Sequence, residues 1–147
     1  MIEVPAAALT VDQFAPHADF FSVGTNDLIQ YTLAIDRTDE RLAGHYEPAA
    51  PAVLRLLRRV AVAARRAGRP VSVCGEMAGD PLEAMALIGL GFRSLSMPPS
   101  AIGPVKIMAR SLEADPLRRY LEALLAQPHR TVRPHLRAYA RDHDVAI

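Results

Sequence analysis

The chain has 147 residues, half of them hydrophobic, and a formal net charge of +1 at neutral pH. This length supports one domain with a substantial core, and the near-neutral charge argues against a nucleic-acid partner. A single cysteine excludes an intramolecular disulfide and a cysteine-pair metal site, and the absence of a long uncharged apolar run predicts a soluble, cytoplasmic protein without a membrane segment.

Strand and helix patterns alternate along the chain. Four short strands are predicted, at residues 1–4, 20–23, 71–74 and 94–97. The second is apolar except for Ser22, which is typical of a parallel strand covered on both faces. Residues 36–51 form a polar, irregular segment that carries His45, Tyr46 and Glu47, and a loop of this length is often functional.

Apolar spacing and capping residues predict the helices. Leu54, Leu57 and Val60 recur at helical intervals in a helix over 51–67, which ends at Gly68. Five arginines form the other side of that helix, interpreted as a solvated face or, alternatively, a partner surface: Arg55, Arg58, Arg59, Arg65 and Arg66. Further helices are predicted from a capping box at Thr10 and Gln13, over 28–35, after Asp80-Pro81, after Ser100, after Asp115 and over 132–142.

Repeated strand–helix units predict an α/β fold with right-handed crossovers. Four such units amount to half of an eight-stranded (β/α)8 barrel of the TIM type, which needs about 250 residues. The expected division is a partial barrel over 1–112 and a helical tail over 113–147. We expect Val23, Val73 and Met97 on the inner barrel face, and open strand edges that promote association.

Reactive side chains follow three of the predicted strands. Glu3 follows the first, Asn26 and Asp27 follow the second, and Cys74 ends the third. Because the carboxyl ends of parallel strands meet on one face, these groups should converge. The carboxylates of Glu3 and Asp27 suit Mg²⁺, while Asn26 and Asp27 could instead simply cap the next helix.

An anion could be held beside these groups. The amide of Asn26 can orient an anionic oxygen, and Arg37 can bind a phosphate or carboxylate through two parallel hydrogen bonds. Backbone N–H groups of Gly24 and Thr25 can also approach a phosphate closely. Cys74, mostly a thiol at neutral pH, can donate a proton, although a lone strand cysteine is often only a small buried hydrophobe.

Three stretches resemble the phosphoenolpyruvate-utilising enzymes: residues 20–37, 74–80 and 3–8. The resemblance extends from Met1 to about Met108, and residues 31–37 and 78–80 are more similar to Enzyme I of the phosphotransferase system than to the dikinases. Residues 132–147 resemble the end of the nitrogen-regulatory form of Enzyme I.

The resemblance implies a role for each candidate residue. Glu3 and Asp27 would hold Mg²⁺, Asn26 and Arg37 would contact the phosphate of phosphoenolpyruvate, and Cys74 would protonate its methylene carbon. It further implies phosphoryl transfer to a histidine on a separate domain and onward to a histidine-containing phosphocarrier protein, with release of pyruvate. A homodimer formed through the barrel domain is also implied.

Other parts of the family's pattern are missing from this sequence. The first half of the barrel is absent, and no histidine lies in the family's phosphohistidine motif: His17, His45, His129, His135 and His143. We therefore expect a fragment that is inactive alone. Two alternatives remain open, a fragment of a pyruvate-phosphate dikinase or phosphoenolpyruvate synthase, and a non-catalytic module for phosphoenolpyruvate binding or dimerisation.

Overall fold

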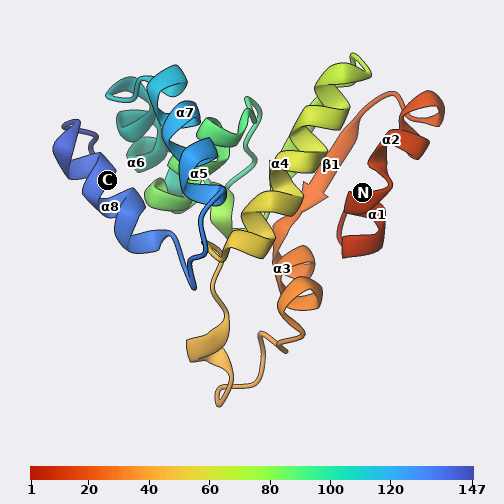
Figure 1. The fold of residues 1–147 in the computed structure, drawn as a ribbon, viewed down its shortest axis with the longest axis horizontal. Helices are drawn as coiled ribbons and strands as arrows, with labels where there is room; N and C mark the ends of the chain where they lie inside the picture. The colour runs from red at the N-terminus through yellow and green to blue at the C-terminus, as the bar shows by residue number, and fades with distance from the viewer.

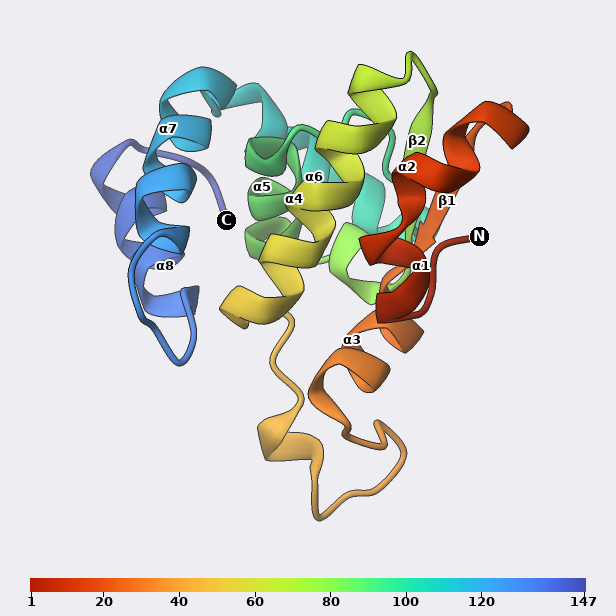
Figure 2. The same ribbon diagram turned by 45° about the vertical axis from the view of Figure 1, so that its right-hand side comes forward.

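A small parallel sheet lies beside the longest helix in the structure, a computed structural model that describes residues 1–147 (Figures 1 and 2). Strand β1 (Phe21–Gly24) pairs in parallel with β2 (Val71–Cys74), with Phe21 opposite Val71. Ile2 forms a single bridge to Val23 on one edge, and Leu95 forms one to Val73 on the other. The order across the sheet is therefore Ile2, β1, β2 and Leu95.

The predicted central strands are confirmed, with β1 shifted by one residue. The first and fourth predicted strands are reduced to single bridges, because prolines open a helix soon after each one: Pro5 begins α1, and Pro99 begins α6. The mixed α/β class is confirmed, whereas the half-barrel remains a prediction.

Eight α-helices and three short 3₁₀ helices make up the rest of the fold. No α-helix has both the length and the apolar character needed to cross a membrane. The α-helices are α1 (Pro5–Leu9), α2 (Val11–Phe14), α3 (Thr25–Leu33), α4 (Pro51–Arg66), α5 (Pro81–Leu90), α6 (Pro99–Arg110), α7 (Ala114–Leu125) and α8 (Arg133–Asp142). The 3₁₀ helices are η1 (Ala15–His17), η2 (Ala43–His45) and η3 (Glu76–Ala78).

Capping predictions met with mixed success. Asp80 caps α5 as predicted, since its carboxylate accepts a hydrogen bond of 3.0 Å from the backbone N–H of Glu83. Thr10 caps no helix through its side chain. Its hydroxyl instead donates to Ala6 O at 2.8 Å, because α1 has already begun at Pro5. The capping prediction for Ser100 is also wrong, because this residue lies inside the first turn of α6, whereas α7 begins at Ala114, next to the predicted start at Asp115.

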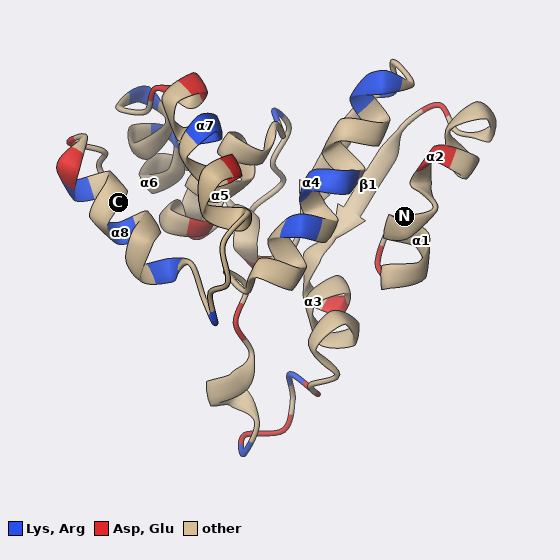
Figure 3. Ribbon diagram, in the orientation of Figure 1, with Lys and Arg blue, Asp and Glu red and all other residues tan.

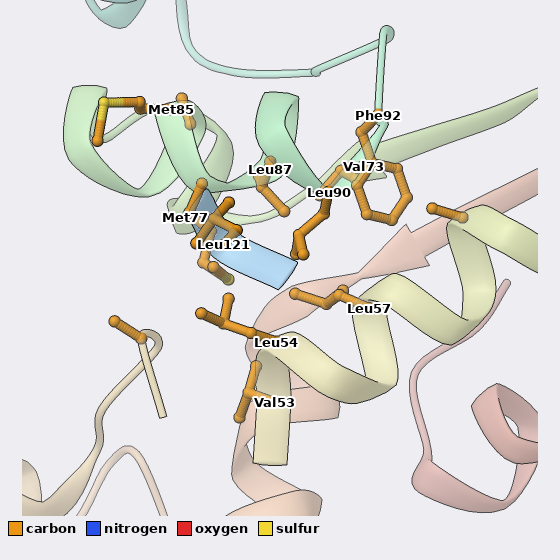
Figure 4. Packing of buried hydrophobic residues seen from close by; sticks show 14 of the residues in the cluster. Val53, Leu54, Leu57, Val73, Met77, Met85, Leu87, Leu90, Phe92 and Leu121 are labelled. Carbon is orange, nitrogen blue, oxygen red and sulfur yellow. The ribbon is translucent and has the colours of Figure 1, made fainter. Parts of the chain in front are cut away.

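One hydrophobic cluster of 36 buried residues unites the sheet with its helices. Leu54 and Leu57 on the apolar side of α4 face Leu121 of α7 and Met77 of η3 (Figure 4). Helix α5 lies among α4, α6, α7 and α8, and eight of its ten residues are buried. This explains why α5 is hydrophobic on almost every side. The strand ends that carry the candidate residues are thus attached to a packed core.

The two faces of the sheet differ in chemistry. Val23 and Val73 are fully buried, whereas Ser22 and Cys74, at alternating positions, are only partly covered. The prediction that Val23 and Val73 line an open inner face is therefore wrong, because side chains alternate along a strand and these two point into the helix-covered core. The other face carries small and polar side chains.

The arginines of α4 appear as blue bands along the helix in Figure 3. Arg55 donates to Leu125 O at 2.6 Å, Arg58 pairs with Glu122 at 3.1 Å, and Arg59 donates to Leu9 O at 2.8 Å. All five arginines are exposed, so the predicted solvated face is confirmed, and these three also bond to neighbouring elements. They fasten α7 and α1 to α4 while keeping their charged groups partly hydrated.

Candidate functional site

Helix α3 begins directly after β1, and this junction carries two candidate residues. Gly24 is the N-cap position and makes no side-chain cap, so Asn26 and Asp27 both lie within the first turn of α3. The alternative that they are capping residues is wrong. Thr25 is fully buried, and its hydroxyl donates to Cys74 O at 3.1 Å, which joins this junction to the end of β2.

The amide of Asn26 is held in one orientation by the segment after β2. Its Oδ1 accepts a hydrogen bond of 3.0 Å from Glu76 N, and its Nδ2 donates to Glu76 Oε1 at 3.4 Å. Gly75 permits this approach, because a Cβ there would lie 2.9 Å from Asn26 Oδ1. The backbone of Gly75, at φ 116°, also favours glycine. The Asn26 N–H₂ group is therefore presented as a donor toward an anion.

Arg37 approaches the same carboxylate from the segment after α3. Its Nη1 lies 3.7 Å from Glu76 Oε1, and its backbone N–H donates to Gln30 Oε1 at 3.2 Å. The Glu76 side chain is 82% exposed. The structure thus brings Asn26 and Arg37 to one exposed anionic group, Glu76, which lies 50 residues from Asn26 in the sequence.

Cys74 ends β2 on the less covered face of the sheet. Its thiol donates to Val23 O at 3.4 Å, and Sγ lies 3.6 Å from Ser22 Oγ. Cys74 and Asn26 line one cavity of about 540 Å³, together with Glu76, Asp80 and others. The cysteine is partly accessible, unlike the inert buried side chain considered above.

Glu3 and Asp27 both lie at the carboxyl end of β1. Ile2 N donates to Ser22 O and Gly24 N donates to Ile2 O, which brings Glu3 alongside Gly24. A Cβ on Gly24 would lie 2.7 Å from Glu3 Oε1, so the side chain of Glu3 covers that glycine. Asp27 follows three residues later, in the first turn of α3.

The chemistry of these carboxylates suits a magnesium ion. Mg²⁺ prefers oxygen ligands and is often bound through one or two carboxylates, with water and substrate oxygens completing the shell. No group of three or more histidine, cysteine, aspartate or glutamate side chains is placed to hold a metal. Any Mg²⁺ held by Glu3 and Asp27 would therefore depend on water and substrate for most of its ligands.

Tyr46 is a site residue whose role the sequence did not indicate. Its hydroxyl donates to Asn26 O at 3.2 Å. Burial raises the pKa of Tyr46 to about 12, with a further increase from the negative charge of Glu76. Tyr46, Arg37 and Glu76 also line a hollow of about 270 Å³. The only sequence signal for Tyr46 is its place in a long polar loop, and the sequence assigns no role to Glu76.

Residues 1–114 match the family of PEP-utilising enzymes over its PEP-binding domain, where PEP is phosphoenolpyruvate, and the chain belongs to this family. The chain is also similar to proteins named phosphoenolpyruvate-protein phosphotransferase. It is 48% identical to that of Geobacillus stearothermophilus over 126 residues, which is 86% of this chain and 22% of the relative. It is 55% identical to that of Cupriavidus necator over 106 residues, 72% of this chain and 18% of the relative.

A relative with another name also matches. The multiphosphoryl transfer protein of Xanthomonas campestris is 50% identical over 125 residues, which cover 85% of this chain and 15% of that protein. The chain thus spans about a fifth of the length of these relatives. The similarity locates the candidate residues within a PEP-binding domain. It does not show that this chain has the activity of a whole relative.

Proposed function

We propose that this chain forms the PEP-binding part of a phosphoenolpyruvate–protein phosphotransferase. The complete system would transfer the phosphoryl group of PEP to a histidine on a separate domain and onward to a phosphocarrier protein, releasing pyruvate. Family membership and the names of the relatives support this proposal. The observation that carries it is the convergence of Asn26, Arg37 and Cys74 around Gly75 and Glu76.

The phosphate of PEP would take the place of the Glu76 carboxylate. Asn26 Nδ2 and Arg37 Nη1 already face that carboxylate, at 3.4 and 3.7 Å. Both are hydrogen-bond donors, and phosphoryl transfer is catalysed mainly by positioning and by neutralising charge. Because Glu76 is largely exposed, its side chain can move into solvent when a more highly charged anion arrives.

Glu3 and Asp27 would hold Mg²⁺ beside this phosphate, as their shared position at the end of β1 suggests. When bound, the metal would neutralise negative charge on the substrate oxygens. The two carboxylates would attract the cation to this end of the sheet.

Cys74 would supply a proton to the enol carbon. As the bond between phosphorus and the enol oxygen breaks, its electron pair stays on that oxygen while the phosphoryl group passes to the acceptor histidine nitrogen. The resulting enolate becomes pyruvate when its methylene carbon takes the proton of the Cys74 thiol. The thiolate left behind regains a proton from solvent. The shared cavity gives a small substrate simultaneous access to Cys74 and Asn26.

The wider arrangement is also proposed by analogy with the family. It comprises a half-barrel over residues 1–112 with a helical tail over 113–147, a homodimer formed through the barrel domain, and a cytoplasmic location. The family match over residues 1–114 supports this proposed division of the chain.

Calorimetric titration with PEP, with and without Mg²⁺, tests the proposal. We expect Mg²⁺-dependent binding that Asn26→Ala weakens at least tenfold, and no comparable binding of pyruvate, which lacks the phosphate. Release of pyruvate on addition of a relative's histidine-bearing domain would distinguish a catalytic domain from a non-catalytic binding module. Absence of Mg²⁺-dependent PEP binding at millimolar concentrations would contradict the proposal.

A further inference from the structure

Arg133, the first residue of α8, joins two distant elements through its guanidinium group. Its Nη2 donates to Glu83 Oε1 in α5 at 2.6 Å and to Glu47 Oε1 at 2.9 Å. Its Nε donates to both oxygens of Glu47, at 3.1 and 3.3 Å. Glu47 lies in the segment between α3 and α4, which projects from the rest of the molecule (Figures 1 and 2). Arg133 thus connects the C-terminal region to this segment.

The three charged side chains are largely withdrawn from water. Glu83 is 10% exposed, and Arg133 and Glu47 are each about a quarter exposed. Burial raises the pKa of Glu83, even though Arg133 donates to it. Burial alone would also raise the pKa of Glu47, but hydrogen bonds from Arg133 and the Ala49 N–H bring it below its ordinary value. Because these charged groups have little contact with water, removing any one of them leaves its partner without a compensating charge and destabilises the network.

Backbone contacts strengthen the connection at the same point. Val132 N donates to Ala49 O at 3.1 Å, and Ala49 N donates to Glu47 Oε1 at 2.9 Å. Elsewhere in the segment, Asp39 pairs with Arg41, and Arg37 lies near Glu76. Residues 132 and 133 are therefore a principal polar attachment of residues 47–49 to the body of the protein.

The attachment leads directly to the candidate site. Tyr46 precedes Glu47, and its hydroxyl donates to Asn26 O. On the other side of Arg133, Glu83 is fixed at the start of α5 by its backbone bond to Asp80, a residue that lines the cavity of Cys74 and Asn26. Arg133 lies outside the residues matched by the family, yet its partner Glu47 follows Tyr46 and its partner Glu83 is bonded to Asp80.

We propose that Arg133 is a positioning residue for the candidate site, and that it holds residues 43–50 so that Tyr46 stays against Asn26. The catalytic consequence rests on the proposed function, whereas the positioning itself is independent of any ligand. Helix α8, which lies outside the residues matched by the family, would thus influence the geometry of the proposed PEP-binding residues.

Amide hydrogen exchange and two-dimensional NMR of the full 147-residue chain, without ligand, test this inference. We expect Arg133→Gln to speed exchange over residues 43–50 at least tenfold, to leave α4 unchanged, and to shift the Asn26 side-chain amide resonances. Glu47→Gln should produce the same pattern in weaker form without altering α8. Arg133→Lys should restore part of the protection, because an ammonium group can reach one carboxylate but cannot bridge both like a guanidinium.

Arg137→Gln is the matched control, since Arg137 is an exposed arginine one turn further along α8. It should change neither readout. Unchanged exchange and resonances in Arg133→Gln would overturn the inference, as would equal acceleration in α4, which would mean that Arg133 supports the whole fold. PEP titration of the same variants is read separately. If the wild-type chain binds no PEP, the proposed function fails, while the exchange and the Asn26 resonances still decide the role of Arg133.

Discussion

Replacing Gly75 with alanine should both destabilise the protein and displace Asn26. Gly75 has φ 116° and ψ 177°, a backbone region that is almost exclusive to glycine and costs other residues about 1–3 kcal/mol. The added Cβ would also collide with the Thr25 hydroxyl and lie 2.9 Å from Asn26 Oδ1. Such overpacking typically costs about 1–3 kcal/mol. The expected loss is thus about 2–6 kcal/mol, a large share of the 5–15 kcal/mol typical of a domain.

Urea unfolding of Gly75→Ala beside two other glycine variants measures this loss. Gly91 has φ 107° but open space around its Cβ position, so Gly91→Ala should show backbone strain alone, about 1–2 kcal/mol. Gly103 lies in α6 with neither a positive φ nor a close neighbour, so Gly103→Ala should stabilise by about 0.5–1 kcal/mol. Comparing the unfolding free energies of the three variants separates the cost of backbone strain from the cost of steric overlap at the added Cβ.

The order of the three variants decides the argument. If Gly75→Ala costs no more than Gly91→Ala, the close approach of Thr25 and Asn26 does not constrain this turn. If Gly75→Ala is as stable as Gly103→Ala, the strain argument fails as well. An intact fold with a displaced Asn26 amide resonance would support the contact and show that the backbone relaxes around it.

Four further predictions follow from the site and its charges. Asp27→Asn should weaken Mg²⁺-dependent PEP binding more than Asn26→Ala, because it removes a charge that attracts the cation; Mg²⁺ titration checks this, and the reverse order would refute the metal assignment. Cys74→Ala, placed in a full-length relative, should leave PEP binding nearly intact but abolish turnover, since a proton donor acts in the transition state; full activity in steady-state kinetics would remove Cys74 from the mechanism. The lowered pKa of Glu47 contributes stability above about pH 4.5 that is lost as the pH falls, so Glu47→Gln should weaken the dependence of the unfolding free energy on pH in the acid range. Glu83, whose pKa is raised, acts in the opposite sense in the wild-type chain and in the variant alike. Identical pH profiles of the two would contradict this prediction. Light scattering at micromolar concentration should find a dimer or larger species, or else hydrophobic dyes should bind, and a dye-negative monomer with a cooperative melt would refute the open-edge argument.

Local patterns in the sequence were sufficient where one element decides its own structure. The apolar spacing of Leu54, Leu57 and Val60 predicted α4, and Asp80 with Pro81 predicted the start of α5. In both cases the stabilising contacts lie within a few residues of one another, so the sequence alone carries the information. The family resemblance of residues 20–37 and 74–80 also pointed to Asn26, Arg37 and Cys74, which the fold brings close together.

Other features depended on contacts between distant residues. Nothing in the spacing of Val23 and Val73 told which face of the sheet the helices would cover, and the structure buries both. Shifting the alternation by one residue exchanges the two faces of a strand, so only the tertiary packing settles the question.

The geometry of the candidate site is likewise a property of the folded chain. The sequence by itself determined which polar residues follow the strands, because strands and helix starts are encoded locally. Only the tertiary structure decided that Glu76 lies between Asn26 and Arg37, that Tyr46 donates to Asn26 O, and that Arg133 reaches Glu47. The last contact joins residues 86 positions apart, and only the folded chain brings these two charges within hydrogen-bond distance.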